Sequence, residues 1–190
     1  MNDEDLRKWL DALGSEHGDY RHAVRWFVAR GPASLPCLVA ALGVEPPGSL
    51  RRARIVETLG EIGDAAAVPV LIELIKEPEL EREIAQALAR IGTGAAEKAL
   101  IGCLRDPRID VVKESTKALG LLRSPAAVGA LRSQLSHPDP SVRYHAVQSL
   151  VEARPGDLDE LLRSHLAAER DPDVRRLIES HVESSDTQTH

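Results

Sequence analysis

The chain has 190 residues, of which 43% are hydrophobic and 3% aromatic, and its formal net charge is −6. This length suits one domain or one elongated array, and the acidic balance argues against a global attraction to nucleic acid or anionic lipid. Ala and Leu supply most of the apolar side chains, which favours stacked helices over a β-sandwich.

Features that bear on the compartment point to the cytoplasm. The opening segment MNDEDLRKWL is acidic and lacks the apolar core of a secretory signal. We see no run of about 18 apolar residues, so we expect no membrane span. Cys37 and Cys103 lie in apolar segments and are expected to be buried, reduced thiols. A cytoplasmic protein is therefore predicted, and the excess of Arg over Lys suggests a bacterial source.

The predicted elements, in chain order, are a cap helix within residues 1–16, five helical hairpins, and a second cap helix over residues 171–183. The five hairpins occupy residues 17–45, 46–77, 78–106, 107–137 and 138–170. Together they are expected to form one domain over residues 1–183, followed by a disordered tail at 184–190.

Three columns of apolar residues, spaced by 29, 31 and 31 residues, carry this prediction. The columns are Leu59, Leu88, Leu119 and Leu150; Leu71, Leu100, Leu131 and Leu162; and Ile75, Leu104, Leu135 and Leu166. Each hairpin has an apolar stripe on both helices that it cannot bury alone, whereas stacked neighbours can bury it. The predicted fold is therefore all-α, a right-handed α-solenoid of about five hairpins with terminal capping helices.

Turn and cap signals fall between the stripes. Asp-Pro pairs at 106–107, 139–140 and 171–172 are typical helix starts, because Asp can cap free N–H groups and Pro is tolerated in the first turn. Gly63-Asp64, Gly92 and Ser124-Pro125 are expected where a first helix ends and the chain reverses.

Two segments, LGEIGDAAAVPVLIELI at 59–75 and VRYHAVQSL at 142–150, resemble the HEAT-like repeat of the phycobilisome-lyase type. The resemblance covers about residues 20–180. It is best in the second, fourth and fifth units. The third unit departs from it, with Ala96-Glu97-Lys98 in place of Ala-Val-Pro, and the fifth loses the Gly-Asp turn. It implies an armadillo-type solenoid and says little about function.

The residues used by enzymes of this fold are not found in the sequence. Deoxyhypusine hydroxylases bind di-iron through His-Glu dipeptides, and this chain has none. HExxH, CxxC, GxSxG and acidic calcium loops are also absent, so we predict no catalytic residue, metal or cofactor. No residue marks the bilin pocket of a phycobilin lyase. Alkylpurine DNA glycosylases grip DNA with a basic face, whereas this chain is acidic.

A binding surface is expected on the second helices, which line the concave face of such solenoids. The ridge opposite the buried stripe lies at positions equivalent to 69, 73 and 76, and its central column is small. The candidate partner-binding residues are Val39, Ile72, Glu73, Lys76, Lys98, Ile101, Arg105, Arg132 and Arg163. Their basic members are Lys98, Arg105, Arg132 and Arg163, predicted to receive an acidic segment. The alternative is that these charges are solvated, or paired with Glu97, Asp106 and Glu160.

Two further sets of residues have structural and functional interpretations. Trp9 and Trp26 are expected to close the first hairpin against the cap helix, the alternative being an aromatic anchor for a partner. Arg54, Arg143 and Arg175 recur near the start of first helices and are expected to join neighbouring links.

The predicted function is a non-enzymatic scaffold or adaptor that binds an unidentified protein or peptide on the concave face. The alternatives are an accessory subunit of a lyase-type enzyme and a HEAT-like nucleic-acid-binding protein. We expect no membrane partner, and nucleic acid is disfavoured by the net charge.

Overall fold

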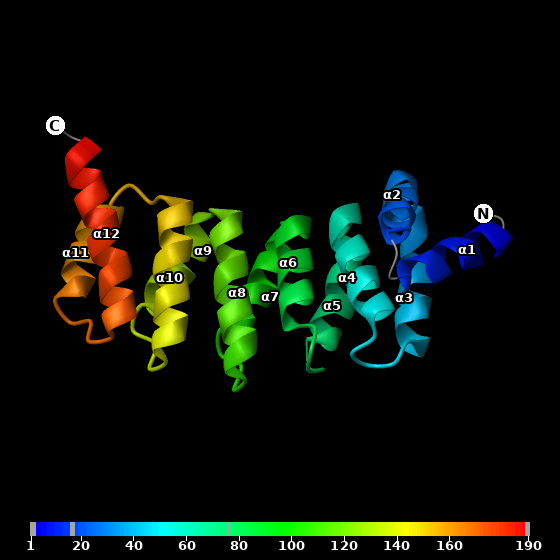
Figure 1. Ribbon diagram of the computed structural model, residues 1–190, viewed down its shortest axis with the longest axis horizontal. Coiled ribbons are helices and arrows are strands. Elements are labelled where there is room, and N and C mark those ends of the chain that lie inside the picture. Colours follow the sequence, from blue (N-terminus) through cyan, green and yellow to red (C-terminus); the bar gives the residue numbers. More distant parts are fainter. Residues whose placement is uncertain (1–2, 16–17, 76, 189–190) are drawn as a thin grey trace. The chain divides into compact units, whose positions relative to one another are not determined.

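The computed structural model describes residues 3–15, 18–75 and 77–188, and every regular element in these ranges is helical (Figure 1). The predicted all-α class is confirmed. The chain forms two compact units, residues 1–99 and 100–190. One continuous array over residues 1–183 stays a prediction.

The first unit holds a cap helix and then helical hairpins, each made of a first and a second helix. Its elements are α1 (Asp3–Leu13), α2 (Tyr20–Arg30), η1 (Gly31–Ser34), α3 (Leu35–Val44), α4 (Leu50–Ile62), η2 (Ala65–Ala67), α5 (Val68–Leu74), α6 (Glu81–Ile91) and the start of α7 (Gly94–Cys103). The first helices α4 and α6 lie side by side in Figure 1, and α1 packs on α2.

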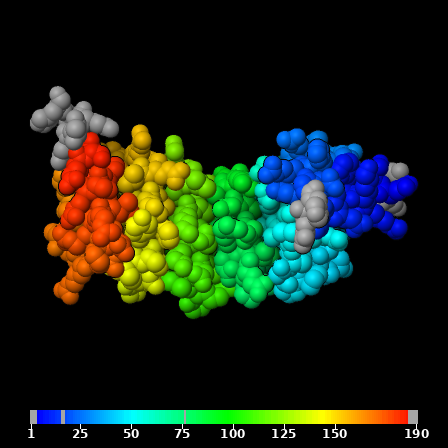
Figure 2. Space-filling model, in the orientation of Figure 1, coloured from blue at the N-terminus to red at the C-terminus, as the bar shows by residue number. Residues whose placement is uncertain are grey.

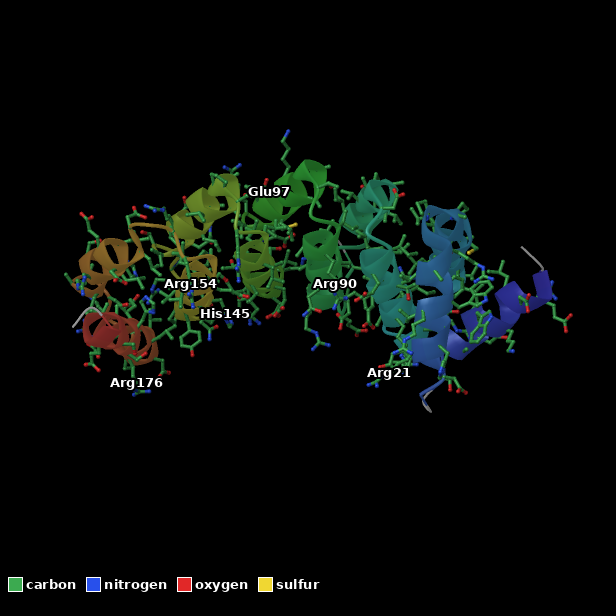
Figure 3. The ribbon with its side chains drawn as sticks, turned by 90° about the horizontal axis from the view of Figure 1, so that it is seen from above. Arg21, Arg90, Glu97, His145, Arg154 and Arg176 are labelled. Carbon is green, nitrogen blue, oxygen red and sulfur yellow. The ribbon has the colours of Figure 1, made fainter. Side chains whose placement is uncertain are left out.

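The second unit continues the same alternation of first and second helices. Its elements after α7 are α8 (Ile109–Leu122), α9 (Pro125–Gln134), α10 (Pro140–Ala153), α11 (Leu158–Leu166) and α12 (Pro172–Gln188). The first helices α8, α10 and α12 form successive green, yellow and orange-red bands in Figure 2. Figure 3 shows α9 and α11 in a second layer behind them.

The predicted apolar columns form the core. The column on the first helices (Leu59, Leu88, Leu119, Leu150) and the main column on the second helices (Leu71, Leu100, Leu131, Leu162) have no exposed surface. The third column is buried at Ile75, Leu104 and Leu135, and only half-buried at Leu166. Since a fully buried Leu contributes roughly 1.5–3 kcal/mol, these columns are the main source of stability within each hairpin.

Close packing between first helices depends on two helical glycines. A Cβ built on Gly60 of α4 would lie 2.7 Å from Ala87 Cα of α6. A Cβ on Gly120 of α8 would lie 2.7 Å from Ser149 Cβ of α10. Both separations are shorter than real Cβ contacts, so each glycine lets its neighbouring helix approach closely. Ser149 Oγ uses this proximity to donate a 3.1 Å hydrogen bond to Thr116 O.

The first helices end in left-handed residues that follow the repeat spacing: Gly63, Gly92, Arg123 and Arg154. Gly63 and Gly92 adopt this conformation without steric cost. Arg123 and Arg154 hold the same conformation, each with φ 52°, despite the Cβ penalty of roughly 1–2 kcal/mol. The second unit therefore accepts strain where the first unit has glycine.

The predicted Asp caps are present at two of the three links. Asp139 Oδ1 accepts from Ser141 N–H at 2.7 Å, and Asp171 Oδ1 accepts from Asp173 N–H at 3.0 Å. The expectation that Asp106 caps α8 was wrong, because the N-cap residue is Arg108, two positions further along the chain. Asp106 Oδ1 instead accepts a hydrogen bond from Arg108 N–H at 2.9 Å, which closes the turn before α8.

One expectation about membranes needs correction. The stretch from Tyr20 to Val44 is long and apolar enough, by length and composition, to cross a membrane. This stretch is folded as two helices, because Gly31 ends α2 at φ 57° and Pro32 follows it. Phe27 on α2 and Leu38 on α3 are both fully buried in the hairpin, as expected for core residues of a folded unit.

Helix α12 also differs from expectation, because it continues to Gln188 rather than ending at residue 183. Residues 184–188 contain no Gly or Pro to stop a helix. Ser184 Oγ donates to Ser180 O at 2.7 Å, and Ser185 Oγ donates to Asp159 Oδ1 at 3.2 Å. Residues 189 and 190 lie outside the described residues.

Candidate functional site

In each of the two units the second helices have exposed residues at the predicted ridge positions. Every described ridge residue is exposed: Pro36, Ala40 and Gly43; Pro69 and Glu73; Lys98, Gly102 and Arg105; Gly129, Ser133 and Ser136; Glu160, Ser164 and Ala167. Added Cβ atoms on Gly43, Gly102 and Gly129 would meet nothing within 4 Å. The ridge is therefore open and has few bulky side chains.

In the first unit the candidate residues beside the ridge are apolar. Val39 on α3 is 36% exposed and Ile72 on α5 is 37% exposed, although both are large hydrophobic residues. Glu73 and Lys98 are exposed, and Lys76 lies outside the described residues. This arrangement offers a partner apolar contacts with a few charges nearby.

In the second unit the candidate residues are mostly basic, but their charges are partly compensated. Ile101 is half-buried and Arg105 is exposed. Arg132 of α9 pairs with Asp157, and the hydrogen bond from Arg132 lowers the pKa of that carboxyl group. Arg163 is exposed and its charge is also partnered.

The ion pairs near these basic residues differ from the ones predicted. Asp106 binds Arg108, with Nη2 and Oδ2 3.0 Å apart, and the hydrogen bond from Arg108 lowers the Asp106 pKa. Asp157, which sequence reasoning missed, is the carboxylate that meets Arg132. The two residues are 25 positions apart in the sequence, and their contact depends on how α9 and the α10–α11 loop come together.

The two tryptophans meet each other between α1 and α2. Trp9 and Trp26 stack with ring centroids 5.9 Å apart, and Phe27 packs edge-on against Trp26 at 5.0 Å. The Arg30 guanidinium lies 3.3 Å from the centroid of Trp26, and Lys8 lies 5.0 Å from that of Trp9. Both tryptophans are half-buried. The contacts are those expected of a cap; an anchoring role for the pair stays a prediction.

A recurring arginine binds the carbonyl groups left free at the ends of second helices. Arg52 Nη1 donates to Leu42 O and Glu45 O, both at 2.8 Å. Arg143 donates in the same way to His137 O and Pro138 O, and Arg175 to Leu166 O and Glu169 O. These arginines therefore join links between hairpins.

The sequence assignment of Arg54 to this series was wrong. Arg52 stands seven residues before Leu59, as Arg143 stands seven before Leu150. Arg54 instead donates to Leu13 O at 2.9 Å and lies 3.9 Å from the ring centroid of Tyr20. It therefore fastens the end of α1 to α4.

The strongest ionic contact of the second unit is buried at the last link. Glu169, with a side chain 2% exposed, accepts hydrogen bonds from Arg143 Nε and Nη2 and from the backbone N–H groups of Arg170 and Asp171. The Arg143 hydrogen bonds lower the Glu169 pKa to about 2. His165 Nε2 lies 3.2 Å from the same carboxylate. This cluster holds α10, α11 and α12 together.

Hollows lie along α12 on the side of the first helices, a feature that sequence reasoning missed. One of about 650 Å³ is lined by Tyr144, His145 and Leu177, among others. A second, of about 800 Å³, is lined by Arg123, Val151 and Arg154, among others. The two share Leu177 and Ser180. Figure 3 marks His145 and Arg154 at α10 and Arg176 on α12.

No group of three or more potential metal ligands occurs among the residues that the structure describes. Cys37 and Cys103 are free thiols, each half-buried rather than fully buried as expected. Burial raises the pKa of both thiols, which keeps them protonated and weakly nucleophilic.

Comparisons with known proteins agree with this architecture. A family model described as HEAT repeats matches residues 35–119 and 98–181. No curated protein matches the chain significantly.

Similar folds also occur among solved structures. The complex of CpcE and CpcF of phycocyanin lyase from Nostoc sp. PCC7120 contains a chain 23% identical, with a TM-score of 0.56; 91% of this chain and 74% of that chain are covered. A designed armadillo repeat protein in complex with a (KR)4 peptide is 16% identical, with a TM-score of 0.53 and coverage of 94% and 98%. An engineered protein is 22% identical, with a TM-score of 0.51 and coverage of 96% and 98%. These likenesses identify the fold as an α-solenoid.

Proposed function

Because this chain belongs to the HEAT repeat family, we propose that it is a non-catalytic scaffold that binds a protein or peptide along the ridge of its second helices. The observation that carries the proposal is the unbroken exposure of the described ridge in every hairpin. Folding requires a buried stripe on each helix, but it does not require small residues at the centre of the opposite face.

The chemistry of the ridge supports a polypeptide ligand. Small side chains such as Ala40, Gly102 and Ser133 allow a partner backbone to approach closely, and Val39 and Ile72 supply apolar contacts beside them. Hydrophobic and aromatic contacts at the centre of an interface supply most of its binding free energy. The solved armadillo complex with a (KR)4 peptide supports the idea that a solenoid of this kind can hold a peptide.

The acidic character of the partner is the finer part of the proposal. Lys98 and Arg105 are exposed, whereas the charge of Arg132 is shared with Asp157. We therefore expect Lys98 and Arg105 to contribute more to long-range attraction of an acidic segment than Arg132 does. Such attraction weakens as ionic strength rises.

The test places a large side chain on the ridge. The binding partner would be recovered from the native host with the wild-type protein, purified, and its Kd measured for Glu73→Trp, Ser133→Trp and the control Gln86→Trp. Gln86 is exposed on α6, a first helix. We expect at least one ridge variant to bind at least tenfold more weakly, while the control binds normally. Equal affinity for all variants would place the interface elsewhere.

A charge test follows on the same partner. Lys98→Glu combined with Arg105→Glu should weaken binding and flatten its dependence on salt, whereas Arg132→Glu should change both less. If the double variant keeps the wild-type salt dependence, the partner segment is not acidic.

A further inference from the structure

We propose that the seam between α10 and α12 is a second docking site, and that it takes an acidic peptide segment of a protein partner. The seam lies on the side of the first helices, so this inference does not depend on the ridge. It rests on how the seam is kept open, on the apolar and basic groups at its two ends, and on the strain accepted at the basic end.

One residue explains why this seam is open. The positions that follow the buried column on the preceding first helices are small: Gly60 on α4, Ala89 on α6 and Gly120 on α8, and the two glycines meet a neighbouring helix. The equivalent position on α10 is Val151, directly after Leu150. Val151 is half-buried and lines the hollow of about 800 Å³ beside α12. A valine side chain at this position prevents the close approach that the glycines allow.

The resulting groove is continuous and differs between its ends. Tyr144 and Leu177 contribute apolar surface to the hollow of about 650 Å³, which is also lined by Asp171, Asp173 and Arg176. Leu177 and Ser180 also line the second hollow, together with Arg123 and Arg154. Beyond Arg154 lies a third hollow, lined by Asp157, Asp159 and Glu160 among others. The hollows are open at the surface, as expected of a groove for an extended segment.

The basic end carries two arginines in an unusual conformation. Both guanidinium groups are exposed, and neither has an ion pair within residues 3–15, 18–75 and 77–185. Among the described residues that line this hollow, Glu152 is the only one with a carboxylate. Non-glycine residues with positive φ cluster at binding sites, where function outweighs strain. Two such arginines at equivalent positions fit a pair of carboxylates on a ligand.

The spacing of the two ends defines the occupant. Arg154 stands ten positions after Tyr144, which corresponds to about 15 Å along α10. An extended peptide covers this distance in about four or five residues. The expected segment therefore carries a large apolar side chain, followed or preceded at that spacing by two acidic side chains.

The probe is a panel of fluorescein-labelled peptides, each with one phenylalanine and a Glu-Glu pair, in which the number of residues between them varies. Binding to the full chain is measured by fluorescence anisotropy at low ionic strength. We expect affinity to peak at a spacing of four or five residues, in at least one order of the two elements, and to be lost when Gln replaces both glutamates. No binding by any member of the panel would overturn the proposal.

Variants then locate the site. Arg123→Gly combined with Arg154→Gly should reduce affinity roughly tenfold or more, corresponding to loss of charge-assisted hydrogen bonds. These substitutions introduce glycine, which already stands at the equivalent positions 63 and 92, so the protein should still fold. Ser180→Trp, which fills the groove where the hollows join, should also abolish binding.

Control outcomes separate this proposal from its alternatives. Ser133→Trp on the ridge should leave peptide binding unchanged; if it alone abolishes binding, the peptide binds the ridge and the groove proposal is wrong. If the double glycine variant melts at a lower temperature but binds the peptide normally, the two arginines only stabilise the C-terminal ends of their helices, and the proposal is wrong. If the wild type is a dimer by sedimentation and Ser180→Trp is a monomer, a second copy of the chain occupies the groove and the proposal fails.

Discussion

Arg143 holds the buried Glu169 carboxylate through two parallel hydrogen bonds, from Nε to Oε2 and from Nη2 to Oε1, each 2.8 Å long. The guanidinium of Arg143 also donates to His137 O and Pro138 O, so a single side chain connects the links before α10 and before α12. A buried carboxylate of this kind depends on its partners, because removing one leaves an uncompensated charge.

This pair makes the stability of the second unit depend on pH. The Glu169 pKa is lowered from 4.5 to about 2 on folding. The ionised form is favoured in the folded state, so the stabilisation is complete above about pH 5 and is lost as pH falls toward 2. From the size of the shift, it is worth roughly 3 kcal/mol. Chemical denaturation across pH 2 to 7 should show this loss for the wild type.

A matched pair of variants isolates Glu169 from the other carboxylates. Glu169→Gln should lower the free energy of unfolding near pH 7 and flatten the acid part of the profile. Glu179→Gln removes a carboxylate that is 45% exposed and lies 3.1 Å from Arg175, and should change the free energy of unfolding by less than about 1 kcal/mol. Equal pH profiles for wild type and Glu169→Gln would contradict the assigned role.

Two helical glycines are expected to change stability in opposite directions when each is replaced by alanine. Gly120→Ala places a Cβ 2.7 Å from Ser149 Cβ and should destabilise by about 1–3 kcal/mol through overpacking. Gly129→Ala, on the exposed ridge of α9, meets nothing within 4 Å and should stabilise by up to about 1 kcal/mol through helix propensity. Urea denaturation measures both. A gain in stability for Gly120→Ala would mean that α8 and α10 are not in close contact.

Two leucines on α8 test the register of the apolar columns. Leu119 has no exposed surface, so Leu119→Ala should cost about 2–5 kcal/mol. Leu121 is 52% exposed on the same helix, and Leu121→Ala should cost under about 1 kcal/mol. Similar losses for the two variants in chemical denaturation would show that the column is misplaced.

The columns and the ridge could be predicted from the sequence, because both depend only on the helical period and on the spacing between repeats. Contacts between hairpins were harder to predict. Arg54 was placed in the wrong series although Arg52 shares the spacing of Arg143, a signal available from the columns. Val151 could likewise have been noticed as the exception to Gly60 and Gly120. The Arg132–Asp157 pair had no sequence signal, since side-chain reach across a loop decides it.

The stacked tryptophans help to keep α1 docked, together with the hydrogen bond from Arg54 to Leu13 O. An isolated helix of 11 residues is marginal in water, so α1 needs tertiary contacts. Trp26 provides them through Trp9 at 5.9 Å and is itself held by Arg30 at 3.3 Å from its ring centroid. Trp26→Ala should therefore increase hydrogen exchange across residues 3–13 and cost roughly 1–3 kcal/mol, less than a fully buried aromatic.

Arg25→Ala is the control for this variant, because Arg25 is exposed on the same helix and takes no part in the described ring contacts of Trp9 and Trp26. Its exchange pattern over residues 3–13 should match that of the wild type. The alternative for Trp26, a partner anchor, predicts the opposite result: a change in stability below about 0.5 kcal/mol and unaltered exchange in α1. Mass spectrometry of peptides from α1 distinguishes the two, since a cap residue changes protection in the absence of any partner and an anchor does not.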